Sequence, residues 1–228
     1  MYIKWIVLIL IFVHMRILVV SATALELKPL MDALSHQENT ELKVNGNIIE
    51  FLHTGVGMTQ TAYALTKALN QSYDLVINAG IAGSFYRGIM VGEVVQVVSE
   101  CITEMGAEDG DVFLEFAKLN LPGTNVYSNS LHKQTPCLDE LKKVLGATVN
   151  KVHGNEDSIN RLLKQFDVEV ETMEGAAVAL VCEQEKIPYI QLRAISNYVT
   201  KRNRDAWDIP LAVKNLNDTL LSVLKELE

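Results

Sequence analysis

Glu171-Thr-Met-Glu-Gly-Ala-Ala-Val-Ala179 and the following Tyr189-Ile-Gln-Leu-Arg-Ala-Ile-Ser-Asn197 decide the fold of this chain. In the first stretch, Glu174 precedes a run of small and apolar residues, 175–182, that is typical of a buried helix. The second stretch has the apolar pattern of a buried strand and ends at Asn197. A carboxylate among apolar residues is costly unless a partner such as a sugar hydroxyl binds it. Since open α/β sheets bind ligands beyond the carboxyl ends of their strands, we expect both residues to face one crevice.

Short apolar runs alternate with helical patterns along the rest of the chain. Strands are predicted at 17–22, 48–54, 75–79, 93–99, 149–152 and 189–196. Helices are predicted at 24–35, 59–70, 156–165, 174–186 and 210–227. This alternation favours an α/β fold with a mixed, mostly parallel sheet and helices on both faces. The polar segment 101–134 contains glycines and a proline, so we expect excursion loops there.

The composition narrows the class of protein. With 228 residues, of which 49% are hydrophobic and 21% charged, the chain can bury the core of one large domain. A net charge of −8 and the absence of a long basic run argue against nucleic acid as a partner. The three cysteines are far apart, which indicates reduced thiols in a cytoplasmic protein. The sequence has no CxxC or HxxxH spacing, so we expect no metal and no cofactor.

The first residues form an apolar run that needs a separate interpretation. Residues 5–13 are too few to span a bilayer, and we expect no membrane partner. Ala22-Thr-Ala24 has the form of a signal-peptide cleavage site, but a cut there would remove the first predicted strand. We therefore expect residues 1–14 to be a dispensable or non-native extension, with Met15 as the initiator and 15–228 as a single domain.

Two glycine turns and one acidic residue follow predicted strands. Thr54-Gly-Val-Gly-Met-Thr-Gln-Thr61 could cradle a phosphate, but it lacks the third glycine of a dinucleotide site and the lysine of a P-loop, so a tight turn is favoured. Asn78-Ala-Gly-Ile-Ala-Gly-Ser84 fits a ligand contact and a structural turn equally well. Glu26 fits the first turn of a helix, where negative charge is favourable; Glu174 can be interpreted in the same way.

Together, Thr172-Met-Glu-Gly-Ala-Ala177 and Arg193-Ala-Ile-Ser-Asn197 resemble the nucleoside phosphorylase/nucleosidase superfamily, in particular its purine nucleosidases. The resemblance runs from Met15 to the C-terminus. It implies a three-layer αβα sandwich and a homodimer or higher homo-oligomer in which a neighbour closes the pocket. It also implies roles for seven residues. Ribose binds to Met173 and Glu174, the base lies near Gly80, Ile81, Asn155 and Asn197, and Glu26 activates the attacking water.

The chemistry of glycosidic cleavage explains these residue types. The transition state develops positive charge on the sugar and negative charge on the departing base. An anionic Glu26 can deprotonate water, and bonds from ribose hydroxyls to Glu174 can strengthen as the sugar distorts. Phosphorylases of the superfamily place arginines where this chain has uncharged residues, 21–25 and Asn78. Without a cation to hold phosphate, hydrolysis is favoured.

Asn197 departs from the pattern of the adenine-releasing nucleosidases, which have aspartate there as an acid. An amide can donate to the oxygen at position 6 of a purine and accept from a protonated N7, which suits hypoxanthine or guanine. Residues 193–198 with 207–211 are similar to futalosine hydrolases, which release hypoxanthine in menaquinone biosynthesis. The aromatic carboxylate of futalosine is expected near 100–130. The alternatives are a methylthioadenosine/S-adenosylhomocysteine nucleosidase, a non-catalytic nucleoside-binding protein and, least favoured, a dinucleotide-binding oxidoreductase.

Overall fold

The computed structural model describes residues 14–34, 42–69, 72–128 and 135–227, so all but the last residue of the predicted extension 1–14 lies outside the described residues. The strands are β1 (Arg16–Ser21), β2 (Leu42–Val44), β3 (Asn47–His53), β4 (Leu75–Ser84), β5 (Val94–Ile102), β6 (Gly106–Asp109), β7 (Val112–Glu115), β8 (Val126–Ser128), β9 (Lys142–Thr148), β10 (Val170–Thr172) and β11 (Tyr189–Tyr198). The helices are α1 (Ala24–Ala33), α2 (Met58–Ala68), α3 (Pro136–Glu140), α4 (Glu156–Gln165), α5 (Gly175–Glu185) and α6 (Ile209–Glu226), with short 3-10 turns η1 (Phe116–Lys118) and η2 (Arg204–Ala206).

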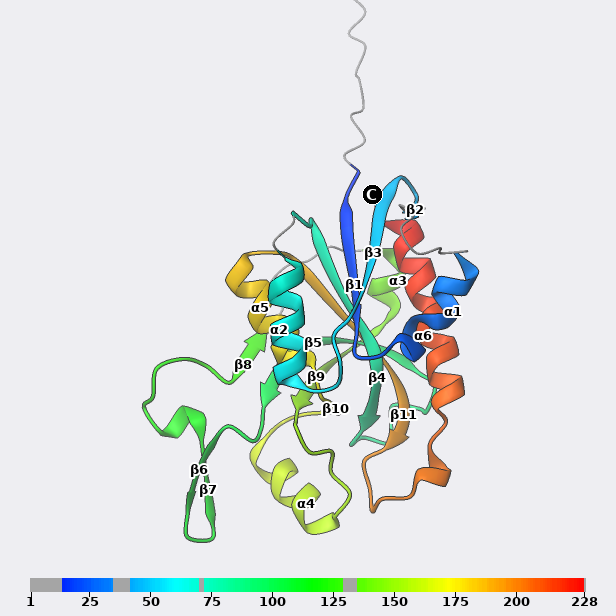
Figure 1. Cartoon of the computed structure of the whole chain (residues 1–228). Helices are drawn as coiled ribbons and strands as arrows, with labels where there is room; N and C mark the ends of the chain where they lie inside the picture. The colour runs from blue at the N-terminus through cyan, green and yellow to red at the C-terminus, as the bar shows by residue number, and fades with distance from the viewer. Residues whose placement is uncertain (1–13, 35–41, 70–71, 129–134, 228) are drawn as a thin grey trace, which may run out of the picture.

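One mixed sheet organises the molecule (Figure 1). Its main path runs β10-β9-β5-β11-β4-β1-β3-β2, and β8 pairs with β5. The strands β3, β1, β4 and β11 are parallel neighbours, whereas β11 and β5 are antiparallel. β10 bonds both to β9 and to β4, so this half of the sheet closes on itself. The predicted α/β class with a mixed sheet is confirmed. The predicted three-layer sandwich applies only to the half of the sheet around β1, where helices cover both faces.

Helices cover both faces of the β1 region because its strands are apolar on both faces. In β1, Ile17 and Val19 pack in one core cluster with residues of α1 and α6. Leu18 and Val20, which point the opposite way, pack in a second cluster with residues of α2 and α5. Figure 1 shows α2 and α5 on one side of these strands and α1 and α6 on the other. The sheet is therefore held in register by burial on both sides.

Two predictions about the strands are wrong. Residues 149–152 are not a strand; the preceding segment, Lys142–Thr148, forms β9, and its exposed lysines had hidden the pattern. The segment 101–134 is not all loop, since β6 and β7 form a hairpin and β8 joins the sheet. Gly110, with φ of +61°, supplies the left-handed backbone that so short a hairpin turn requires. The other predicted strands and helices lie within a few residues of the observed ones.

Two further features are absent from the described ranges of the chain. None of the helices there is long and apolar enough to cross a membrane. Within the same ranges, no three or more His, Cys, Asp or Glu side chains are grouped so that they could hold a metal ion.

Candidate active site

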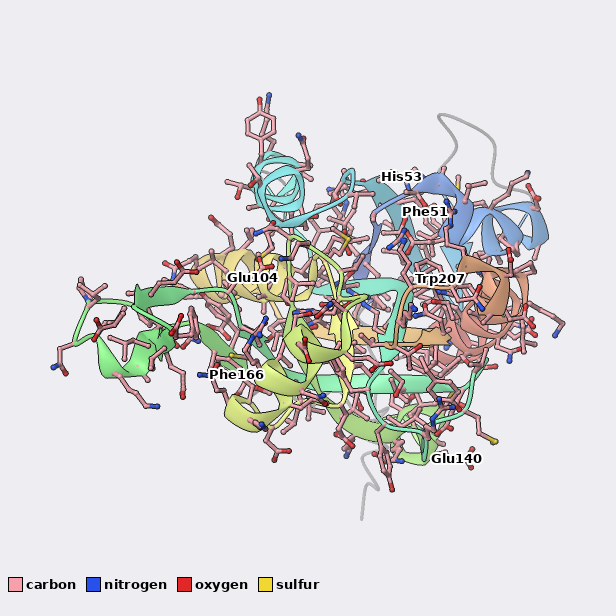
Figure 2. The ribbon with its side chains drawn as sticks, turned by 90° about the horizontal axis from the view of Figure 1, so that it is seen from below. Phe51, His53, Glu104, Glu140, Phe166 and Trp207 are labelled. Carbon is pink, nitrogen blue, oxygen red and sulfur yellow. The ribbon has the colours of Figure 1, made fainter. Side chains whose placement is uncertain are left out.

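A cavity of about 330 Å³ opens at the carboxyl ends of β1, β4, β10 and β11. This edge of the sheet lies toward the bottom of Figure 1, and Figure 2 views the molecule from that side. The lining comes from segments that are distant in sequence, as expected for a site at the strand ends of an α/β fold. The lining residues are Ala22, Thr23, Leu25, Glu26, Val56, Ile81, Ala82, Gly83, Val152, His153, Glu171, Thr172, Met173, Glu174, Ser196, Asn197, Trp207, Ile209 and Val213.

Glu26 lies in the first turn of α1 and also reaches the floor of the cavity. Its Oε2 accepts a hydrogen bond from the backbone N–H of Thr23 (2.9 Å), and its Oε1 accepts one from the N–H of Ile81 (3.2 Å). A Cβ added at Gly80 would lie 2.9 Å from Oε1, so this glycine makes room for the carboxylate. The helix-capping interpretation and the catalytic one are therefore compatible. The N–H donors stabilise an anionic carboxylate in place.

Glu174 is anchored by the glycine turn that precedes α2. The N–H of Gly57 donates to Glu174 Oε1 at 2.8 Å. Gly57 has φ of +94° and Gly55 has φ of +85°, a backbone that favours glycine at both positions. Burial raises the pKa of Glu174, while the Gly57 N–H and the Arg193 guanidinium act against that rise. The turn therefore holds a carboxylate of the chain itself.

Asn197 lies near the end of β11, and its amide has a defined orientation. Its Nδ2 donates to the carbonyl oxygen of Tyr198 (3.1 Å), and its Oδ1 accepts from the hydroxyl of Ser196 (2.7 Å). The carbonyl can only accept, so the NH₂ group must face it. One N–H and one lone pair of the amide remain for a ligand. Gly83 leaves room for the side chain of Asn197, because a Cβ added at Gly83 would lie 3.3 Å from Nδ2.

The other predicted site residues divide into two groups. Met173 and Ile81 line the cavity. Gly80 is absent from the lining and acts beneath it, through the space it leaves for Glu26. Asn155 does not reach the cavity, because its exposed side chain accepts from the N–H of Ser158 and caps α4. Two other residues of that loop, Val152 and His153, do reach the cavity, and the sequence interpretation identified neither as a site residue.

A second missed residue, Glu171, is paired with His153. The backbone N–H of His153 donates to Glu171 Oε1 (3.0 Å), and the ring Nδ1 lies 2.5 Å from Oε2. Both side chains are almost fully buried, and both line the cavity. Glu171 lies three residues before Glu174, but only the pairing of β10 with β9 and β4 brings it to this wall.

The charge of the cavity wall favours a neutral nucleophile. The wall carries three carboxylates, those of Glu26, Glu171 and Glu174, and none of its described residues is lysine or arginine. Arg193 lies beneath the site at 1% exposure and donates to the carbonyl oxygens of Asn78 (3.3 Å) and Leu192 (3.0 Å). Such a wall suits water better than phosphate, because an anion would enter a field of like charge.

The mouth of the cavity is apolar on one side and basic near Trp207, which Figure 2 shows on the segment before α6. Leu25 and Val56 line the mouth and are 74% and 54% exposed. The guanidinium carbons of Arg202 and Arg204 lie 5.4 Å and 6.0 Å from the centre of the Trp207 ring. None of the described residues in 100–130, where the 5′ substituent was expected, lines this cavity.

Comparison with known proteins places the chain in a family. The model of the phosphorylase superfamily matches residues 16–226. A curated 5′-methylthioadenosine/S-adenosylhomocysteine nucleosidase from Haemophilus influenzae (strain PittEE) is 27% identical over 93% of this chain and 100% of its own length. A futalosine hydrolase from Acidothermus cellulolyticus is 32% identical over 73% of this chain and 71% of its own length.

Solved structures show the same fold. The nucleosidase of Neisseria meningitidis, in complex with methylthio-immucillin-A, superposes with a TM-score of 0.78 at 20% identity, covering 93% of this chain and 99% of that one. The futalosine hydrolase of Helicobacter pylori superposes with a TM-score of 0.76 at 18% identity, covering 93% of this chain and 98% of that one. The curated relatives are nucleosidases and hydrolases, so the predicted enzyme class is confirmed. With a family model that matches nearly its whole length, the chain belongs to the phosphorylase superfamily.

Proposed function

We propose that this enzyme hydrolyses the N-glycosidic bond of a 6-oxopurine nucleoside, with futalosine as substrate and hypoxanthine as the released base, in menaquinone biosynthesis. The observation that carries the proposal is the fixed amide of Asn197 in a cavity that also holds Glu26 and Glu174 and has no lysine or arginine in its described wall.

Glu26 acts as the general base in this proposal. The N–H groups of Thr23 and Ile81 fix its carboxylate, so that it can orient a water molecule and take its proton. Glu174 accepts the ribose hydroxyls through Oε2 while Gly57 holds Oε1. These contacts position the sugar and stabilise the positive charge that develops on it.

Asn197 selects and stabilises the leaving base. Its free N–H donates to the oxygen at position 6, and its free lone pair accepts from N7 once N7 is protonated. Adenine presents an amino donor at position 6, which would face the N–H of the amide. A pocket that leaves such groups unpaired discriminates strongly between two bases.

The basic mouth supports a substrate with an anionic 5′ group. Trp207 lines the cavity, and the guanidinium groups of Arg202 and Arg204 bring two positive charges close to its ring. An aromatic carboxylate can stack on the indole and bind a guanidinium. Methylthioadenosine carries no such charge. The proposal includes a second copy of the chain that covers the exposed Leu25 and Val56 and closes the pocket in a homodimer or larger assembly.

The second candidate is a methylthioadenosine/S-adenosylhomocysteine nucleosidase. Most of the similar curated relatives carry this name. The experiment that separates the candidates incubates the purified protein with futalosine, inosine or methylthioadenosine and identifies the free base by chromatography. Hypoxanthine released from futalosine supports the proposal. Adenine released from methylthioadenosine, without hypoxanthine from futalosine, refutes it in favour of the second candidate. No base from any substrate would indicate a nucleoside-binding protein.

A further inference from the structure

A histidine–carboxylate pair forms part of the cavity wall near Asn197. His153 occupies both oxygens of Glu171, through its backbone N–H and its ring Nδ1, and the two side chains are 10% and 4% exposed. Glu171 lies opposite Gly83 in the β10–β4 ladder, and Gly83 is the residue that Asn197 approaches. The pair is therefore next to the amide that binds the base.

The carboxylate determines which ring nitrogen carries the proton. An ionised Glu171 can only accept, so Nδ1 of His153 must donate to it. In this tautomer of the imidazole, Nε2 is a bare acceptor. Within the described part of the chain, Nε2 has no hydrogen-bond partner. An acceptor on the cavity wall that has no protein partner is suited to a donor on the ligand.

One aromatic contact and one backbone hydrogen bond of the neighbouring residue restrain the ring of His153. Phe85 packs edge-on against it, with ring centres 6.5 Å apart and an interplanar angle of 63°. The carbonyl oxygen of Gly154 accepts from the N–H of Arg202 (3.2 Å), which ties this loop to the loop before α6. On another side the ring borders a second cavity of about 880 Å³, also lined by Glu104 and Phe166, which Figure 2 labels.

We propose that His153 accepts a hydrogen bond from N1–H of the purine through Nε2, and that Glu171 is the positioning residue that fixes this tautomer. The inference rests on the proposed function and names the residue that reads the second polar edge of the base. A 6-oxopurine has a donor at N1, whereas adenine has a bare acceptor there. His153 and Asn197 together then match three polar positions of hypoxanthine, namely N1, the oxygen at position 6 and N7.

Binding of free bases tests the contact directly. Hypoxanthine and 1-methylhypoxanthine differ in the N1 donor, and their affinities can be measured by calorimetry on the intact enzyme. We expect the methyl group to weaken binding to the unmodified enzyme at least tenfold, about 1.4 kcal/mol. In His153→Ala the two affinities should come within about threefold of each other, because a missing acceptor cannot distinguish them. Asn155→Ala, in the same loop but outside the cavity, should keep the full ratio.

Two further variants test the tautomer. In Glu171→Gln the amide can donate to Nδ1 and place the proton on Nε2, so the ratio of hypoxanthine to adenine affinity should fall. If His153→Ala does not fold, His153→Gln replaces it. Its amide N–H can meet the bare N1 of adenine, so its hypoxanthine-to-adenine ratio should also fall.

The outcomes separate this inference from the proposed function. If the unmodified enzyme releases adenine and not hypoxanthine, the proposed function fails and this inference with it. If hypoxanthine is released but the ratio is unchanged in the His153 variants, this inference alone is overturned. Equal losses of affinity for hypoxanthine, 1-methylhypoxanthine and adenine in the His153 variants would likewise overturn it. They would show that the ring of His153 only separates the two cavities and does not contact N1.

Discussion

Replacing Glu100 by glutamine should change how the stability of the protein depends on pH. Glu100 is fully buried at 0% exposure in β5. The Thr148 hydroxyl donates to its Oε2 (2.8 Å), and the Thr172 hydroxyl donates to its Oε1 (3.2 Å). Burial raises the pKa of this carboxyl from 4.5 to about 7, and the Arg193 charge and the two hydroxyls act against that rise. Glutamine has nearly the same shape and remains neutral at every pH.

The direction of the pKa shift of Glu100 decides whether its ionisation stabilises or destabilises the folded protein. A carboxyl whose pKa is higher in the folded state favours folding while it is protonated, so its contribution is complete below pH 4.5 and is lost as pH rises through about 7. The rise corresponds to about 3 kcal/mol of unfolding free energy between these limits. Relative to the unmodified enzyme, Glu100→Gln should therefore gain stability by up to about 3 kcal/mol between pH 4.5 and pH 8.

Urea unfolding at several pH values from 4.5 to 8 measures this difference. The unfolding free energies of the two proteins should diverge with rising pH, with most of the change between pH 5 and pH 7.5. Glu185→Gln, at an exposed site on α5, removes the same charge and serves as the control. If the difference between Glu100→Gln and the unmodified enzyme is constant over this range and matches that of the control, the assignment of a buried, protonated carboxyl is refuted.

Three predictions concern the reaction. Glu26→Gln should lower kcat by roughly 10²- to 10⁴-fold with little change in hypoxanthine affinity, measured by steady-state kinetics and calorimetry; unchanged kcat would exclude the general base. Glu174→Ala should raise KM and lower kcat together, because ribose positioning serves both; normal kinetics would remove this role. Asn197→Asp should lose hypoxanthine release from futalosine and gain adenine release from methylthioadenosine, followed by chromatography; an unchanged substrate preference would contradict the amide's role.

The sequence predicted those helices and strands whose own residues carry a clear apolar periodicity. Helix α4 was predicted with its observed limits, because polar and apolar residues alternate with a clear helical period. Strand β9 was misplaced because its first residues, Lys142 and Lys143, are exposed at the start of an otherwise buried strand. The hairpin of β6 and β7 projects from the sheet and buries little, so its weak apolar pattern resembled a loop.

The candidate site residues were predicted at the ends of elements. Asn197 directly follows a predicted strand, and Glu26 and Glu174 lie in the first turn of predicted helices; the structure brings all three to one cavity. His153 and Glu171 could not be paired from the sequence, because they are 18 residues apart and meet only through the register of β10 against β9 and β4. Neither has a spacing that marks a site, and a buried pair of this kind becomes visible only with the fold.

The choice between water and phosphate as nucleophile depends on the turn before α2. A glycine turn that opens a helix can bind an external anion through its N–H groups. In this enzyme the N–H of Gly57 instead holds the carboxylate of Glu174, and the left-handed backbone at Gly57 is what points it there. A phosphate that entered would meet Glu26 and Glu174 without a lysine or arginine in the described wall to offset them. Water meets no such repulsion, and Glu26 can activate it, so the same carboxylates that would repel phosphate favour hydrolysis.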